Sequence, residues 1–389
     1  MQTREGKKEQ NRDISRRSFI LGSGTAAILS RTGIPALAFA AGQTEGPEVK
    51  MILRRDRPLN LEAPRAALNS WLTPTGHFYV RNHYQNPEVD FREWRIAIGG
   101  EVSRTLQLDM AALMQLPKTT LICPLECTGN GRAYFKPQTR GNQWEMGAVG
   151  NAVWGGVRLK DILGKTDIRS AGKYITFKGG EKRPAETAPR FIRSVPLAKA
   201  MRDIILAYEM NGQPLTPDHG FPVRAIVPGW YGASSVKWLN AIDVTQAPDP
   251  GHYQEKSYRL ILKGQEIGQA EFANVMKVKS VITHPSSDPL SAGMVGVQGV
   301  AWTGKGKISR VEISADAGKT WTDTRLTGPE LPYAWQSWFY AWEAKPGTYS
   351  LMSRATDSAG RIQPMNSVWN KKGYANNAVA DHALQIHVS

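Results

Sequence analysis

The sequence predicts an α+β domain followed by an all-β sandwich of the immunoglobulin type. Between residue 78 and about residue 246, short β-rich runs alternate with helical pieces; the clearest are FYVRNH, WRIAIGG, YITFKGG, FPVRAIVPGW, LDMAALMQLP and SVPLAKAM. From about residue 273 onward, closely spaced strand patterns alternate with turns rich in Gly, Asp, Pro and Ser, and no convincing helix appears. These patterns are KVKSVITH, GMVGVQGVAW, SRVEISAD, WFYAWEA and GTYSLMSRATD.

The N-terminus has the pattern of an export signal. SRRSFIL (15–21) carries paired arginines, a modestly apolar run follows, and small residues stand at 36–40. This order predicts a twin-arginine signal over residues 1–40 and a periplasmic protein. The alternative is the basic amphipathic N-terminus of a cytosolic protein. We therefore expect a signal at 1–40, the α+β domain at 41–272 and the sandwich at 273–389.

Composition narrows the classes of partner. The 389-residue chain has a formal net charge of +15. Its lysines and arginines are scattered, and nucleic acid is not expected as a partner because no run is dense enough to follow a phosphate backbone. An anionic small molecule or an acidic partner fits better. After the signal, no segment approaches the roughly 18 apolar residues of a membrane span.

The chain has two cysteines, Cys123 and Cys127, in the stretch ICPLECTGNGRAYF. A disulfide would close a very small loop and contribute little stability. A zinc or iron–sulfur site needs three or four soft ligands, which the chain does not offer. Two alternatives remain open. Both cysteines are inert and buried, or Cys127 is a thiolate, favoured by Arg132, that acts with a cofactor bringing further sulfur ligands.

Three further segments carry residues suited to an anion. FYVRNH places polar and cationic groups at the end of a strand, DHGFPVR surrounds a bend, and PGWYGASSVKW is a loop with small hydroxyl residues and a lysine. Each also has a structural explanation when taken alone, as a capped turn, a core histidine or a solvated arginine. The candidate residues are Arg81, Asn82, His83, His219, Arg224, Ser235 and Lys237.

Together these segments resemble the sulfite oxidase family of molybdopterin-dependent oxidoreductases. The resemblance extends from about residue 75 to the C-terminus. Its most specific stretches stand in the family's order: FYVRNH, ECTGNGR, WEMGAVGNAVWGGVRLKDIL, LAYEMNGQPLTPDHGFPVRAIVPG and SVKWL. The C-terminal part, with SADAGKTW and WNKKG, resembles the family's dimerisation domain, which implies a homodimer.

The resemblance implies a role for individual residues. It implies one molybdenum–molybdopterin per chain, with Cys127 as the metal ligand and Cys123 outside the motif. The implied cofactor contacts are Arg81, Asn82, His83, Glu181, His219, Arg224, Ser235, Val236 and Lys237. The implied substrate side consists of Arg81, Arg132, Trp144, Tyr258 and Lys372, where Lys372 stands at the position of a family arginine.

The function implied by the resemblance is oxidation of sulfite to sulfate by oxo transfer. We expect no haem, because no Cys-x-x-Cys-His motif or haem-binding domain precedes the molybdenum region. Electrons are then expected to pass to a separate acceptor such as a c-type cytochrome. The alternatives are the sulfane dehydrogenase subunit of a thiosulfate-oxidising complex and a non-catalytic anion-binding protein of the same fold. A methionine sulfoxide reductase subunit is disfavoured, because that branch lacks the sandwich.

Overall fold

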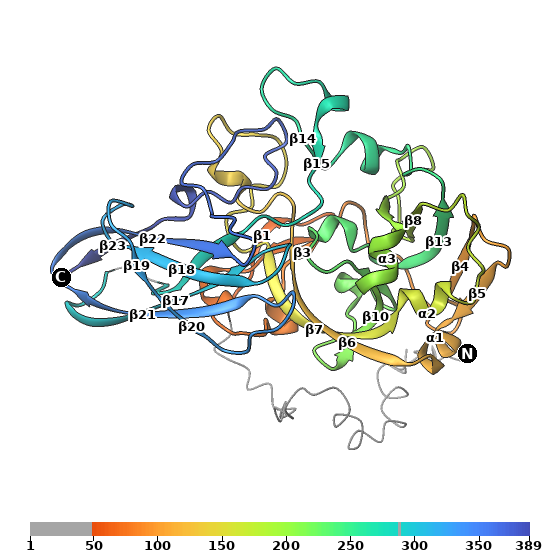
Figure 1. The fold of residues 1–389 in the computed structure, drawn as a ribbon, viewed down its shortest axis with the longest axis horizontal. Coiled ribbons are helices and arrows are strands. Elements are labelled where there is room, and N and C mark those ends of the chain that lie inside the picture. Colours follow the sequence, from red (N-terminus) through yellow and green to blue (C-terminus); the bar gives the residue numbers. More distant parts are fainter. Residues whose placement is uncertain (1–48, 287–288) are drawn as a thin grey trace, which may run out of the picture. The chain divides into compact units, whose positions relative to one another are not determined.

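The structure, a computed structural model, describes residues 49–286 and 289–389. The predicted signal at 1–40 lies outside the described residues. Within them, an α+β region is followed by strands arranged in two layers, which confirms the predicted fold class (Figure 1). None of the described helices combines the length and apolar character that crossing a membrane requires.

One sheet of the α+β region is antiparallel except for a single parallel pair, β4 with β13. Helix α1 (Met110–Gln115) follows β5 directly, and the Asp109 side chain caps it by accepting a hydrogen bond from the Ala112 amide at 2.7 Å. Helices α2 (Leu159–Leu163) and α3 (Leu197–Asp203) bury their apolar faces in the same core. In sheet order the strands are β5 (Leu106–Asp109), β4 (Arg95–Gly100), β13 (Leu239–Thr245), β8 (Tyr174–Gly179) and β9 (Ile192–Pro196).

The helix predicted over SVPLAKAM begins later than expected. Ser194, Val195 and Pro196 finish strand β9, and the helix starts at Leu197. Pro196 has an extended backbone and stands at the N-cap, because a proline suits the start of a helix and not its interior. The helix predicted over LDMAALMQLP is confirmed as α1.

A second sheet contains two long strands that the sequence patterns did not predict. Strand β6 includes Pro124, and β7 includes three glycines, so neither shows the composition of a typical strand. Two of these glycines are required by close neighbours: a Cβ on Gly150 would lie 2.6 Å from the Phe78 ring, and one on Gly156 would overlap the Leu206 carbonyl. The strands are β6 (Lys118–Glu126), β7 (Val149–Arg158), β10 (Ile205–Met210), β11 (Gln213–Pro214) and β12 (Arg224–Ile226).

Short strands complete this region. Only Val80 and Arg81 of FYVRNH form a strand, β3, which pairs with β2. The polar residues that follow are therefore loop residues at a strand end, where their side chains are free to face a ligand. The short strands are β1 (Ile52–Arg55), β2 (Asn60–Glu62), β3 (Val80–Arg81), β14 (Arg259–Leu260) and β15 (Glu271–Phe272).

The C-terminal strands form two four-stranded sheets, drawn in cyan to blue in Figure 1. Apolar side chains from both sheets, among them Val297, Trp338 and Leu351, form one core. Strand β22 coincides with the predicted strand GTYSLMSRATD. One sheet is β16 (Lys279–His284), β17 (Gly293–Trp302), β21 (Gln336–Ala344) and β20 (Arg325–Thr327); the other is β19 (Thr322–Asp323), β18 (Ile308–Ser314), β22 (Gly347–Asp357) and β23 (Leu384–Val388).

A buried carboxylate joins the sandwich to the end of β6. Glu126 accepts hydrogen bonds from Trp302 Nε1 at 2.9 Å and from Asn130 Nδ2 at 3.0 Å. Lys279 Nζ lies 3.3 Å from Glu126 Oε1, and both side chains are almost fully buried. The same ammonium donates to the Asn376 carbonyl at 2.9 Å. Residues far apart in the chain thus meet at the residue that precedes Cys127.

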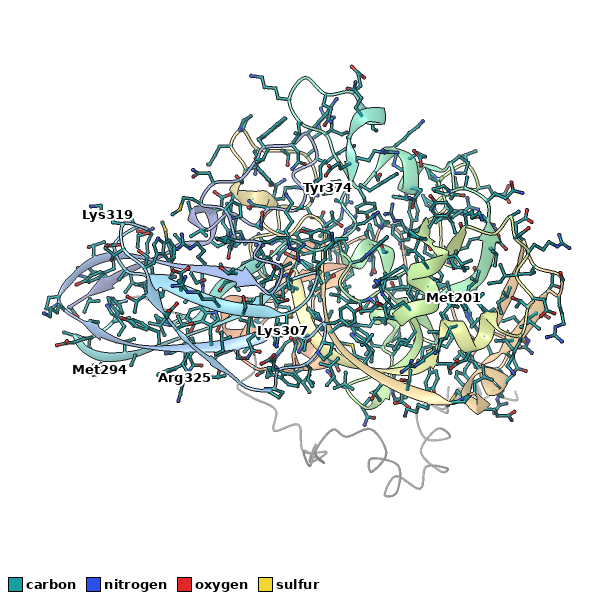
Figure 2. The ribbon with its side chains drawn as sticks, viewed as in Figure 1. Met201, Met294, Lys307, Lys319, Arg325 and Tyr374 are labelled. Carbon is teal, nitrogen blue, oxygen red and sulfur yellow. The ribbon has the colours of Figure 1, made fainter. Side chains whose placement is uncertain are left out.

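We predict that Lys279→Met destabilises the protein by about 3–5 kcal/mol, because it leaves a buried charge without its partner. The measurement is the free energy of unfolding in urea. The exposed Lys319 (Figure 2) provides the matched control, and Lys319→Met should change that free energy by less than about 0.5 kcal/mol. Equal effects of the two substitutions would show that the buried pair does not hold the two regions together.

Candidate functional site

A pocket lies where the ends of several strands and their loops converge. It contains about 720 Å³ of space not filled by protein, part of it open solvent. Ten of the residues predicted from the sequence line it: Arg81, Asn82, His83, Cys127, Glu181, His219, Arg224, Ser235, Lys237 and Tyr258.

The two cysteines differ in their surroundings. Cys123 is a fully buried residue of β6 in an apolar cluster, and burial raises the pKa of its thiol to about 12. Cys127 follows the end of β6 and lines the pocket. Burial also raises the pKa of the Cys127 thiol, whereas the charges of Arg81 and Arg132 act to lower it. Both cysteines are free, so the described chain contains no disulfide between them.

The loop after Cys127 is held by the side chain of Asn130. Its amide donates to Glu126, and its carbonyl oxygen accepts from the Ala148 amide at 3.1 Å. The Cys127 amide also donates to the Ala148 carbonyl at 2.8 Å. Asn130 therefore connects both sides of the loop, and this explains why an asparagine stands between two glycines in ECTGNGR.

Arg132 is buried beside this loop, with 7% of its surface exposed. Its Nε donates to the Lys372 carbonyl at 3.0 Å and its Nη1 to the Asn142 carbonyl at 2.9 Å. Gly129 makes room for the guanidinium, since a Cβ there would lie 2.5 Å from Nη2. No carboxylate forms an ion pair with Arg132 within the described residues. Its positive charge is therefore available to an anion.

A polar network surrounds the strand end at Arg81. Arg81 Nη1 donates to the Asn82 carbonyl, and Asn82 is fixed by hydrogen bonds with Asn60. Lys237 Nζ donates to Asn82 Oδ1 and, at 2.7 Å, to the Asp218 carbonyl. Burial and the charge of Arg224 lower the pKa of Lys237 well below its ordinary value. The network places amide and cationic groups on one wall of the pocket.

His219 and Arg224 also line the pocket. His219 Nδ1 lies 2.7 Å from Thr216 Oγ1, and burial lowers the pKa of its imidazole to about 3, so the ring is neutral. Arg224 donates to the carbonyls of His219 and Ser235, and its guanidinium stacks over the Trp154 ring. Burial lowers the pKa of Arg224 to about 10, which leaves it charged at neutral pH.

Tyr258 and His83 both line the pocket, and their side chains contact each other. Tyr258 Oη lies 2.8 Å from His83 Nε2, and the two atoms form a hydrogen bond. Burial and the charge of Arg81 lower the pKa of His83 well below its ordinary value, and the ring is neutral. Glu181 Oε1 accepts from the Phe191 amide at 2.9 Å, and burial raises the pKa of this carboxyl.

Four predicted residues do not line the pocket. Trp144 is fully buried in the apolar cluster against which Cys127 packs, and Val236 belongs to the core of the α+β region. Arg132 lies next to the pocket without lining it. The Lys372 carbonyl accepts a hydrogen bond from Arg132. The positive charge of the Lys372 side chain lowers the pKa of His252, and burial lowers that pKa more. These four residues therefore lie outside the pocket lining, whereas the other ten predicted residues form part of it.

Several residues at the pocket have no counterpart in the sequence predictions. Thr128, Asp218, Phe191 and Trp238 line it, and Arg193 and Tyr374 contact Tyr258. Thr128 and Asp218 stand directly beside predicted residues, so adjacency in sequence could have indicated them. Tyr374 is separated from Tyr258 by more than one hundred residues, and no local pattern connects the two.

The lining fits a large anionic cofactor with soft ligands of its own. Three buried polar atoms without a hydrogen-bond partner belong to residues that line the pocket, namely Thr128 Oγ1, His219 Nε2 and Arg224 Nε. Four cationic side chains, Arg81, Arg132, Arg224 and Lys237, surround a region with few carboxylates. Across residues 49–286 and 289–389 no three His, Cys, Asp or Glu side chains group as metal ligands. A metal here would need a cofactor in addition to Cys127.

Family models match both regions of the chain. Residues 83–253 match the oxidoreductase molybdopterin binding domain, and residues 270–388 match the Mo-co oxidoreductase dimerisation domain. These spans agree in order with the two predicted domains, whose limits at 41–272 and 273–389 remain predictions.

Curated relatives include both sulfite oxidases and nitrate reductases. Sulfite oxidase of Gallus gallus is 33% identical over 346 residues, covering 83% of this chain and 75% of the relative. Mitochondrial sulfite oxidase of Rattus norvegicus is also 33% identical, and there the chain spans 65% of the relative's length. Nitrate reductase [NADH] 2 of Phaseolus vulgaris is 34% identical, with 82% of this chain and 40% of the relative covered.

A solved structure resembles the chain over nearly its whole length. The crystal structure of the sulfane dehydrogenase SoxCD from Paracoccus pantotrophus matches with a TM-score of 0.78 and 29% identity, covering 92% of this chain and 96% of that one. The two regions of the fold, the chemistry of the pocket lining and these similarities all indicate the same family. The chain belongs to the sulfite oxidase family of molybdopterin-dependent oxidoreductases.

Proposed function

We propose that this protein is a molybdenum-dependent oxidoreductase that oxidises sulfite to sulfate. The observation that carries the proposal is the combination of a pocket-facing thiol, Cys127, with cationic groups that form no ion pair with a carboxylate of the described residues. A thiolate is a soft metal ligand, and the surrounding positive charge favours both an anionic cofactor and an oxyanion substrate.

Residues of this chain would hold the cofactor as follows. Cys127 would bind the metal, while Arg224, His219 Nε2, Ser235 and Lys237 offer hydrogen-bond donors and charge to the anionic part. When bound, molybdenum–molybdopterin would supply the oxygen-atom transfer and accept two electrons.

The substrate side is formed by Arg81, Arg132 and Tyr258. Conversion of sulfite and water to sulfate releases two electrons and two protons. The two guanidinium groups would attract and orient the dianion, because neither is neutralised by a carboxylate. The hydrogen bond between Tyr258 Oη and His83 Nε2 would fix the Tyr258 hydroxyl beside the substrate, and the lowered pKa of His83 keeps this ring neutral.

The setting of the reaction is part of the same proposal. The arginine pair in SRRSFIL favours export to the periplasm in the folded state. We expect electrons to leave to a c-type cytochrome, with no haem in this chain. The match of residues 270–388 to a dimerisation domain favours a homodimer.

The second candidate function is that of a sulfane dehydrogenase subunit. The likeness to SoxCD, which spans both regions of the chain, favours it. The two candidates differ in substrate: free sulfite in the first case, and a sulfane sulfur in the second.

We predict that protein purified from a host that makes the cofactor contains about one molybdenum per chain and reduces cytochrome c when sulfite is added. Metal analysis and a spectrophotometric assay provide the measurements. Molybdenum without sulfite turnover would favour the sulfane dehydrogenase. Absence of molybdenum would contradict the enzyme assignment and favour a non-catalytic anion-binding protein.

We also predict that Cys127→Ser lowers sulfite turnover by more than about 100-fold while the fold persists, because the soft metal ligand is lost. Cys123→Ser is the matched control. It places a hydroxyl in an apolar cluster and should lower the melting temperature, yet turnover per bound molybdenum should stay near that of the wild type. Equal loss of turnover in both variants would instead indicate a site with two thiols.

A further inference from the structure

Four side chains form a continuous stack beside the pocket. The Arg193 guanidinium lies 5.0 Å from the centre of the Tyr258 ring, and the Tyr258 ring stacks on the Tyr374 ring at 5.5 Å with 20° between their planes. The Arg132 guanidinium lies 5.2 Å from the centre of the Tyr374 ring. Tyr374 therefore contacts both Tyr258 and Arg132, two of the proposed substrate-side groups.

The segment that carries Tyr374 (Figure 2) is fixed at both of its ends. The Ala375 amide donates to the Thr128 carbonyl at 2.8 Å, one residue after Cys127, and the Lys371 amide donates to the Ile261 carbonyl at 2.9 Å. Asn370 encloses the tyrosine's own backbone, accepting from its amide at 3.0 Å and donating to its carbonyl at 2.9 Å. Main-chain contacts hold the segment of this ring beside the loops of Arg132 and Tyr258, and the Tyr258 backbone also hydrogen-bonds the Tyr374 hydroxyl.

Arg132 is held by this ring and by two backbone carbonyls. It donates to the carbonyls of Lys372 and Asn142, and no carboxylate among the residues that the structure describes pairs with it. Gly373 permits the close approach, because it has φ +59° and a Cβ there would lie 2.8 Å from Arg132 Cγ. A cation over an aromatic face is attracted to the ring, most strongly when the pair is desolvated, and the stacked tyrosine pair adds a further stabilising contact. The stack orients the guanidinium without neutralising it.

We propose that Tyr374 is a positioning residue that sets the orientation of Arg132 and Tyr258 toward the oxyanion substrate. This inference rests on the proposed function. It assigns a role to Tyr374, a residue of the C-terminal region that stands two positions after Lys372. The side chain of Lys372 does not line the pocket. The α+β region supplies the groups that face the substrate, and the C-terminal region aligns them.

The experiment compares Tyr374→Phe, Tyr374→Leu and Tyr374→Met in the cofactor-loaded protein. Two readouts are required: kcat and KM for sulfite, each per bound molybdenum, and the Kd for sulfate measured by calorimetry. Tyr349→Leu is the matched control, since Tyr349 packs on Trp342 in the sandwich and donates to the Lys345 carbonyl.

We expect the Leu and Met variants to raise KM for sulfite and Kd for sulfate by about 10-fold, with a smaller change in kcat. The Phe variant keeps the ring and should stay within about twofold of wild type in both quantities, as should the Tyr349 control. The proposal is overturned if Leu and Met leave KM and Kd unchanged, or if Phe is as impaired as Leu. It is also overturned if Leu and Met both fail to fold while Phe is fully active, because the ring would then be structural.

Failure of the proposed function gives a different result. If loaded wild-type protein oxidises no sulfite, the sulfite assignment is lost. The sulfate Kd of the wild type and its variants still reports whether Tyr374 orients the anion site.

Discussion

The structure depends on one buried carboxylate. Glu126 ends strand β6 and accepts hydrogen bonds from the sandwich, through Trp302 and Lys279, and from the cysteine loop, through Asn130. Cys127 is the next residue, so its position is set by contacts that begin in both regions of the chain. A buried ion pair adds little stability by itself, but it is costly to break, and this makes it a strong constraint on the geometry.

The scarcity of carboxylates near the buried arginines determines the charge of the pocket. Buried arginines here are held by backbone carbonyls and aromatic faces: Arg132 by Lys372, Asn142 and Tyr374, and Arg224 by His219, Ser235 and Trp154. Such contacts fix a guanidinium and leave its charge uncompensated. The positive charge of the pocket thus favours the binding of anions. The proposed cofactor and the proposed substrate are both anions. His83 and His219 are neutral, so the excess charge comes chiefly from the arginines.

The sequence predicted the fold class and ten of the nineteen residues that line the pocket. Most of the ten stand in local patterns, whereas Glu181 and Tyr258 were predicted only from the family resemblance. A strand end with Arg81, Asn82 and His83, or a turn with Ser235 and Lys237, is visible within a few residues. Strands β6 and β7 were not predicted, since their glycines and Pro124 serve close packing and obscure the strand pattern. Trp144, Val236 and Lys372 were predicted from family resemblance, and the structure places them outside the lining. Tyr374 and Arg193 were missed because their contacts with Tyr258 arise only when distant segments fold together.

The central claim is that Cys127 supplies the protein's ligand to molybdenum. X-ray absorption at the molybdenum edge tests it most directly, on loaded wild-type protein and on the Cys127→Ser and Cys123→Ser variants. The account predicts that the metal of the wild type and of Cys123→Ser has one more sulfur neighbour than the metal of Cys127→Ser. An identical sulfur shell in all three proteins would contradict it.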